Sequence, residues 1–274
     1  MTDERRSLPI AVFDSGVGGL TVARAVIDLL PAEPIVYFGD TARSPYGPRP
    51  VAEIRGFARE IAARLLEYDV KTLVVACNSV EVAAIEDLTA EAAVPVIGVI
   101  DPGVRAAIRA TRSGRIGVIG TEATIASGAY DRAVERVDPA IDLVSVACPV
   151  FVPFVERGDT TSDELLAAAR GYLTPMVAEK VDTLVLGCTH YPLLSGLLQL
   201  VMGPDVVLVS SAEETAKDVY ATLHREGLLS VGGTVQHRFL CSGDPDAFLA
   251  VGARFLGPEM TAVRAAGVRE AAWS

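Results

Sequence analysis

The stretch Thr72-Leu73-Val74-Val75-Ala76-Cys77-Asn78-Ser79 returns in similar form as Thr183-Leu184-Val185-Leu186-Gly187-Cys188-Thr189-His190. Each copy is a short apolar run that ends in a cysteine and polar side chains, which is typical of a buried strand in a parallel sheet. Similar apolar runs lie upstream at residues 10–14 and 116–120, 63 residues before Cys77 and 68 before Cys188. This faint repeat predicts two similar halves that face each other and place their cysteines on opposite walls of one cleft.

Strand-like runs alternate with longer, Ala-rich helical stretches along the rest of the chain. We expect strands at residues 10–13, 35–38, 72–76, 94–99, 116–119, 143–147, 183–186 and 206–209, and helices at 20–30, 51–67, 80–91 and 164–180. From about residue 213 the pattern indicates a helix, a turn at Gly232-Gly233, a further strand at 236–241 and more helix. The alternation predicts an α/β protein with parallel sheets covered on both faces.

Composition excludes several classes of protein. Of the 274 residues, 50% are hydrophobic, which is ample for a packed core, and no apolar run reaches the roughly 18 residues of a membrane span. A net charge of −11 argues against nucleic acid as a partner. Four cysteines fit neither a disulfide framework nor a zinc pattern, and the N-terminus lacks signal-peptide anatomy. We therefore expect a cytoplasmic protein that binds neither nucleic acid nor membrane.

The two matched cysteines are candidates for chemistry. Ligands of open α/β sheets bind outside the carboxyl ends of the strands, where Cys77 and Cys188 are expected. Adjacent helix N-termini would lower the pKa of a thiol and hold a carboxylate. Either cysteine alone would be an ordinary core residue, as we expect for Cys148 and Cys241, which lack the matched context. Two cysteines at matching strand ends, each followed by polar side chains, favour a functional role for both.

Two loops follow the first two strands. The segment 14–19, Asp14-Ser15-Gly16-Val17-Gly18-Gly19, could bring backbone amides close to an anion, but Thr21 stands where a dinucleotide fingerprint needs glycine. It is either a ligand loop or a capped turn, and its carboxylate suits a substrate that carries an ammonium group. In residues 39–48, Tyr46 either covers a pocket or packs on its own helix, and Asp40 is expected to brace the turn.

Two further residues each have two possible roles. His190 could assist a thiol or hydrogen-bond a carboxylate, but a lone histidine next to a Pro-containing turn is often structural. Glu156 follows the apolar run 151–155 and is either a carboxylate at the cleft edge or a surface residue that ends a buried segment.

Five motifs, in this order and spacing, resemble the glutamate racemase family. They are Phe13-Asp14-Ser15-Gly16-Val17-Gly18-Gly19-Leu20, Gly39-Asp40-Thr41-Ala42-Arg43, Pro45-Tyr46-Gly47, Ala76-Cys77-Asn78 and Leu186-Gly187-Cys188-Thr189-His190-Tyr191-Pro192. The resemblance extends to about Thr215 and also includes Val209-Ser210-Ser211-Ala212-Glu213-Glu214-Thr215-Ala216.

The resemblance implies racemisation of L- and D-glutamate with no cofactor and no metal, supplying D-glutamate for peptidoglycan. It also implies two α/β domains related by a pseudo-two-fold axis, with the site between them. We expect residues 1–98 plus 213–274 to form the domain that carries Cys77, and 99–212 the domain that carries Cys188. A homodimer is expected.

Site residues follow from the matched motifs. Cys77 would take the α-proton from D-glutamate and Cys188 from L-glutamate, while Asp14, Glu156 and His190 assist proton transfer. Residues expected to line the substrate are Asp14, Ser15, Tyr46, Gly47, Asn78, Ser79, Thr189 and His190. The sequence departs from the family after Asn78, where Ser79-Val80 stands in place of Thr-Ala or Ser-Ala. The branched Val80 puts substrate packing near the first cysteine in question.

The sequence leaves three alternative functions open. A racemase of aspartate or another acidic amino acid would use the same thiols, and pocket size would decide between them. A non-catalytic amino-acid binder would not need both cysteines. A thiol redox protein would need cysteines close enough to form a disulfide, often as CxxC, which this sequence lacks.

Overall fold

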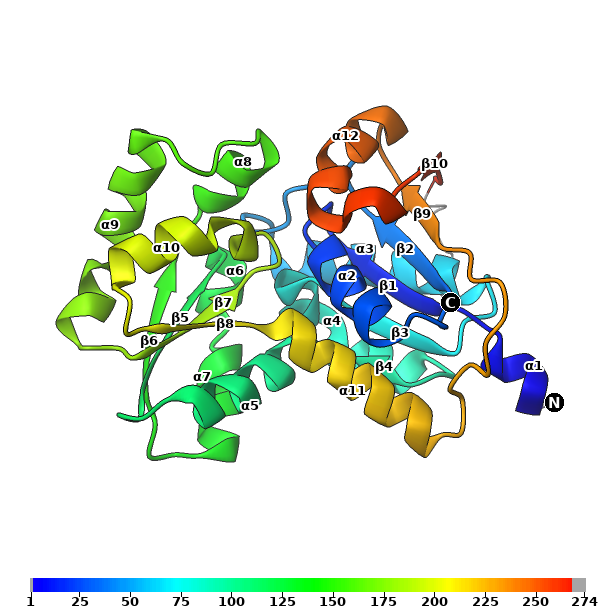
Figure 1. The fold of residues 1–274 in the computed structure, drawn as a ribbon, viewed down its shortest axis with the longest axis horizontal. Coiled ribbons are helices and arrows are strands. Elements are labelled where there is room, and N and C mark those ends of the chain that lie inside the picture. Colours follow the sequence, from blue (N-terminus) through cyan, green and yellow to red (C-terminus); the bar gives the residue numbers. More distant parts are fainter. Residues whose placement is uncertain (1, 268–274) are drawn as a thin grey trace.

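The computed structural model describes residues 2–267 and contains two sheets in which every strand pairing is parallel (Figure 1). The first sheet has the order β10-β9-β2-β1-β3-β4 and the second β6-β5-β7-β8. Their strands are β1 (Ile10–Asp14), β2 (Ile35–Gly39), β3 (Thr72–Val75), β4 (Val96–Ile97), β5 (Arg115–Gly120), β6 (Asp142–Ala147), β7 (Thr183–Gly187), β8 (Val207–Ser210), β9 (Arg238–Cys241) and β10 (Arg264–Ala265). The α/β prediction is confirmed.

The two sheets repeat one pairing scheme. Ile10 of β1 pairs with Thr72 of β3, and Ile116 of β5 pairs with Thr183 of β7. These are the positions that the internal repeat aligns. The orders β2-β1-β3-β4 and β6-β5-β7-β8 therefore correspond strand for strand, and β9 and β10 extend the first sheet only.

Helices fill the connections between the strands. They are α1 (Thr2–Arg6), α2 (Leu20–Leu29), α3 (Val51–Leu66), α4 (Asn78–Glu91), α5 (Ile100–Ala110), α6 (Glu122–Ala126), α7 (Ala129–Val137), α8 (Phe151–Glu156), α9 (Asp163–Ala178), α10 (Ser195–Met202), α11 (Ser211–Arg225) and α12 (Pro245–Leu256), with short 3-10 turns η1 (Tyr191–Leu194) and η2 (Gly257–Glu259). Helix α9 begins where the Ser162 hydroxyl accepts the Leu165 N–H, a side-chain cap that satisfies an end amide.

The expected strand at 94–99 is shorter than predicted. Strand β4 ends at Ile97 because the next free amides have another partner. The N–H groups of Val99 and Ile100 donate to the Glu81 carboxylate of α4, at 2.5 and 3.0 Å. The apolar pattern of this run predicted burial correctly. It could not show that a carboxylate side chain, instead of a neighbouring strand, accepts the hydrogen bonds of these backbone amides.

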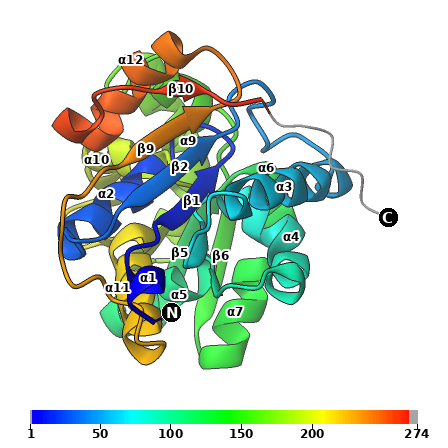
Figure 2. The ribbon, with the colours of Figure 1, turned by 90° about the vertical axis from the view of Figure 1, so that its right-hand side faces the viewer.

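Alternate residues of β1 pack against different helical layers, and Figure 2 shows helices on both faces of the first sheet. Ile10 and Val12 pack in a cluster with residues of α2 and α11, and Ala11 and Phe13 pack in another with residues of α3 and α4. Both faces of the sheet are therefore covered, which explains its continuous apolar strands.

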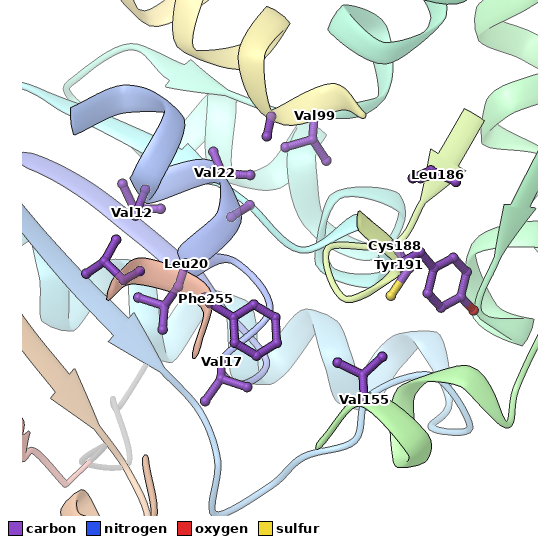
Figure 3. Close-up of a cluster of buried hydrophobic side chains, with 14 of the residues drawn as sticks. Val12, Val17, Leu20, Val22, Val99, Val155, Leu186, Cys188, Tyr191 and Phe255 are labelled. Carbon is purple, nitrogen blue, oxygen red and sulfur yellow. The ribbon is translucent and has the colours of Figure 1, made fainter. Parts of the chain in front are cut away.

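One hydrophobic cluster joins both halves of the molecule. Figure 3 shows it running from Val12 and Leu20 on the first side, past Val17 and Phe255, to Val155 and residues of the second sheet. It includes Leu186, Cys188 and Tyr191. The second cysteine thus lies where the core meets the junction of the halves.

The chain crosses from the first sheet to the second after β4 and leaves the second after β8. The first expected domain limit, 98/99, lies between β4 and α5, whereas the second, 212/213, falls inside α11. Helix α11 packs on both α2 and α5 and so contacts both halves (Figure 1). The domain limits stay a prediction. Within residues 2–267, no helix has the length and apolar character needed to cross a bilayer.

A buried ion pair fastens the amino ends of the first sheet. Lys71, 0% exposed, contacts Glu33, 2% exposed, and donates to the carbonyls of Arg6 and Leu228 at 2.7 and 3.1 Å. The second Glu33 oxygen accepts the Ser230 N–H at 2.8 Å. Segments distant in the sequence are therefore held around one ammonium group.

Lys71→Met should lower the free energy of unfolding by about 3–5 kcal/mol, because it leaves the Glu33 carboxylate buried without its cation. Urea unfolding measures this loss. Arg136→Gln is the control, since it breaks an exposed pair with Asp101 and should cost less than about 1 kcal/mol. Equal losses in the free energy of unfolding in the two variants would show that the buried pair stabilises the fold no more than an exposed pair does.

Candidate functional site

A cavity of about 160 Å³ lies at the carboxyl ends of strands from both sheets. Ser15 follows β1, Cys77 follows β3, Thr121 follows β5 and Cys188 follows β7. Nine of the predicted site residues line it: Ser15, Tyr46, Gly47, Cys77, Asn78, Ser79, Cys188, Thr189 and His190. The remaining wall is made by Ser44, Pro45, Pro48, Thr121, Glu122, Pro149, Val152 and Pro153.

Cys77 is the cap residue of α4 and is 6% exposed. Its thiol lies 3.6 Å from the Ser15 hydroxyl, to which it donates. We expected the helix N-terminus to lower the pKa of this thiol, and that expectation is wrong for Cys77. Burial and then the nearby Asp14 charge raise the pKa to about 12, against the smaller lowering by hydrogen bonds from Ser15 and Val80. Cys77 is therefore a neutral thiol near pH 7.

Cys188 is also 6% exposed, but its surroundings differ. The chain after it forms the 3-10 turn η1 before α10 begins, so no α-helix starts directly at this cysteine. Its Sγ lies 3.9 Å from Nδ1 of His190. The imidazole, rather than a helix N-terminus, is the group positioned to stabilise a thiolate on Cys188.

His190 connects Cys188 to Glu156. Nε2 of the ring lies 3.3 Å from Oε1 of Glu156, which is an ion-pair distance. Burial by itself lowers the pKa of His190, but the hydrogen bonds with Cys188 and Glu156 and the electrostatic attraction of Cys188 and Asp14 outweigh it and raise the pKa to about 10. His190 therefore carries a positive charge at neutral pH. Glu156 does not line the cavity itself but contacts the His190 ring, which does.

Asp14 is fully buried next to the cavity rather than on its wall. Its two carboxylate oxygens accept the Gly16 N–H at 2.7 Å and the Thr189 hydroxyl at 3.1 Å. Burial raises its pKa, although the His190 charge and these hydrogen bonds act in the opposite direction. Asp14 thus links the first loop of one half to the motif of the second cysteine.

Glycine at position 18 is required by this close approach. A Cβ there would meet Thr189 Oγ1 and His190 Nδ1 at separations that real Cβ atoms do not show. Both of those atoms are hydrogen-bonded within the site, to Asp14 and to Cys188. A side chain at position 18 would push the Cys188 motif away from the first half.

The loop at residues 39–48 closes one side of the cavity. Asp40 braces it, as expected, by accepting hydrogen bonds from the Tyr46 hydroxyl, Arg43 and Ser242. Tyr46 both lines the cavity and packs on Phe57 of α3, with the two rings tilted by 43° and their centres 5.5 Å apart, so both interpretations of this residue hold. The Gly47 carbonyl accepts the Ala123 N–H of α6 at 3.2 Å, which ties the loop to the other half.

Polar groups beyond the thiols converge on the cavity. Ser79 Oγ lies 2.9 Å from Thr121 Oγ1 across the two halves. The Asn78 amide nitrogen donates to Tyr130 at 2.9 Å, and its buried Oδ1 has no partner among the described residues. Val80 is fully buried in the core on the α3 and α4 side and is not among the cavity-lining residues, so its bulk does not enter the cavity.

Sequence reasoning missed Thr121, although the signal was present. The repeat that aligns 10–14 with 116–120 also aligns Ser15 with Thr121, and both side chains line the cavity. Pro149, Val152 and Pro153 carry no comparable signal, because their places depend on how α8 packs. Among residues 2–267, no three His, Cys, Asp or Glu side chains gather to hold a metal ion.

Comparison with known proteins places the chain in a family. The Asp/Glu/Hydantoin racemase family matches residues 19–219, which contain both cysteine motifs. The chain belongs to this family. Racemases are isomerases, and solved glutamate racemases share the α/β fold with two parallel sheets.

Similar members of the racemase family have been characterised by sequence and by structure. The chain is 57% identical to a glutamate racemase of Parafrankia sp., over 93% of each chain, and 54% identical to one of Acidothermus cellulolyticus, over 93% of this chain and 97% of the relative. A crystal structure of a glutamate racemase from Bacillus anthracis matches with a TM-score of 0.91 and 41% identity, covering 96% of this chain and 98% of that one. One from Francisella tularensis in complex with D-glutamate matches with a TM-score of 0.92 and 34% identity, over 97% and 100%.

Glu156→Gln should lower the pKa of His190 from about 10 toward 6.5, because it removes a negative partner of the imidazolium. Nitrogen-15 NMR titration of the histidine rings measures this change. His224 and His237 serve as internal controls, and their titrations should not move. An unchanged His190 titration would show that Glu156 does not act on the ring.

Proposed function

We propose that the chain is a glutamate racemase that works without a cofactor, using Cys77 and Cys188 as two acid/base groups on opposite faces of one substrate. The single observation that carries the proposal is the convergence of both cysteines, from equivalent strand ends of the two sheets, on one cavity. The similar sequences and structures named glutamate racemase support glutamate as the substrate.

Two groups are needed because racemisation inverts a stereocentre. One base removes the α-proton, and an acid on the opposite face returns a proton to the carbanion. A single base would tend to return the same proton to the same face. Both thiols are almost buried, and water exclusion strengthens the interactions that stabilise the developing charge.

The groups around the two thiols differ. In the resting state Cys77 would be the neutral thiol, and the Cys188 sulfur would face the ring of protonated His190. For L-glutamate, Cys188 in its thiolate form would remove the α-proton, and Cys77 would deliver its own proton to the other face. Turnover leaves Cys77 as thiolate and Cys188 as thiol, which is the state that D-glutamate requires.

Asp14, Glu156 and His190 would tune this exchange. Glu156 holds the His190 charge, and His190 stabilises the Cys188 thiolate. The Asp14 charge disfavours a thiolate on Cys77 and favours the cation on His190, so it biases the proton toward Cys77 in the resting state. We propose that Asp14 acts through these groups and through Ser15 and Thr189, which stand between it and the cavity.

Substrate binding would depend mainly on neutral donors. His190 is the one basic residue among those described as lining the cavity, in a chain of net charge −11. The hydroxyls of Ser15, Ser79 and Thr121, with nearby backbone amides, are the groups available to hold the carboxylates, whereas the Thr189 hydroxyl donates to Asp14. These same donors would stabilise the carbanion when its charge spreads onto the α-carboxylate.

The cellular role is part of the proposal. D-Glutamate made by this reaction would supply peptidoglycan synthesis, in a cytoplasmic setting. The expected homodimer also stays a prediction, which sedimentation of the purified protein would test. An aspartate racemase of Picrophilus torridus and an aspartate racemase homologue of Pyrococcus horikoshii share the fold at 17% and 18% identity, so the substrate must be tested directly.

In D₂O with L-glutamate and no added cofactor, the first D-glutamate formed should carry deuterium at the α-carbon, while the remaining L-glutamate stays protiated. The reason is that the returned proton comes from a second, solvent-exchanged thiol. Proton NMR with chiral chromatography measures both pools, with L-aspartate as the parallel substrate. Faster turnover of aspartate would overturn the assignment of glutamate, and equal early labelling of both glutamate pools would overturn the two-base mechanism.

Cys77→Ser and Cys188→Ser should each lower kcat by about 10²–10⁴-fold, the usual contribution of a positioned acid or base. Cys241→Ser is the matched control, because that thiol is also buried but lies outside the cavity lining, and it should retain wild-type turnover. Near-normal racemisation by both cavity variants would rule out the thiol mechanism.

A further inference from the structure

Tyr130 is a buried residue of α7 that touches the neighbourhoods of both cysteines. It is 2% exposed and packs in the hydrophobic cluster between the second sheet and α5. It does not line the cavity.

The first contact crosses between the two halves. The Tyr130 hydroxyl accepts the Asn78 Nδ2–H group at 2.9 Å. Asn78 is the first residue of α4, directly after Cys77, and is 3% exposed. Its nitrogen is therefore committed to the other half of the molecule, while its buried Oδ1 has no partner within the described chain. An unpartnered buried acceptor in a cavity-lining residue is free to bind a ligand N–H group.

The second contact is with the strand that carries Cys188. A Cβ on Gly187 would lie 3.1 Å from Cε2 and 3.2 Å from the hydroxyl oxygen of Tyr130, and 2.7 Å from the Ile119 carbonyl oxygen. The Tyr130 ring thus lies directly on the backbone of Gly187, the residue before Cys188. The missing side chain at Gly187 leaves the space that the phenol occupies.

We propose that Tyr130 is a positioning residue that sets the Asn78 amide relative to the Cys188 strand, and so aligns the substrate between the two thiols. It acts through Asn78 and does not touch the substrate. Without its hydroxyl, the Asn78 side chain can rotate, and the amide no longer presents one fixed acceptor to the cavity. This inference rests on the proposed racemase function.

Tyr130→Phe tests the proposal, because it removes the hydroxyl and keeps the ring. We expect kcat/KM for glutamate to fall by about tenfold, the effect of losing one buried hydrogen bond in the reacting complex. In an Asn78→Ala background the same substitution should have no further effect, since the group that it positions is gone. If Asn78→Ala turns over too slowly, the same double-mutant cycle can be measured by binding. Calorimetry then gives the dissociation constant for D-glutamate of the wild type, the two single variants and the double variant.

Tyr191→Phe is the matched control. It also removes a buried hydroxyl, one that donates to the Cys148 carbonyl at 2.9 Å, so its cost in thermal stability should be similar. Its effect on kcat/KM should simply add to that of Asn78→Ala. A merely structural Tyr130 would behave in the same way, so additivity of Tyr130→Phe with Asn78→Ala would overturn the inference. Wild-type protein without activity on glutamate would overturn the proposed function instead.

Discussion

Parallel strands bring all their carboxyl ends to one edge of a sheet, and in this molecule two such edges meet. Every group in the cavity depends on that meeting. The equivalent pairings of Ile10 with Thr72 and of Ile116 with Thr183 place the two cysteines at matching positions of the two sheets. Contacts across the junction, such as Thr189 with Asp14 and Ser79 with Thr121, then hold the two edges together.

Cys77 and Cys188 occupy equivalent positions, but their electrostatic surroundings differ. Cys77 stands at the start of an α-helix, yet burial and the Asp14 charge keep it protonated. Cys188 stands before a 3-10 turn and has a charged imidazole next to its sulfur. The fold places the two cysteines at equivalent positions, but the neighbouring side chains give them different electrostatic surroundings. A mechanism that uses one thiol and one thiolate requires such a difference.

Much of the fold and of the cavity wall could be predicted from the sequence, because both depend on local pattern. Continuous apolar runs identified the strands, and the rule for strand ends identified Cys77 and Cys188 as lining residues, while Ser15 followed from the matched family motifs. The pKa of Cys77 could not be predicted in this way, since burial and a charge from another loop outweigh the local helix. The depth of Asp14 and the contact between Tyr130 and Asn78 were likewise beyond reach, because both depend on how the halves pack.

The Glu81 carboxylate joins the crossover between the halves to the helix that begins at Asn78. It receives the first amides at the start of α5, and burial raises its pKa to about 7, against the lowering by those two amides. Gly98 lies so close to it that a Cβ there would overlap the carboxylate. A rotation of the second half about this crossover would therefore pull on α4 itself. The crossover and the helix that follows the first thiol are therefore joined through one buried carboxylate.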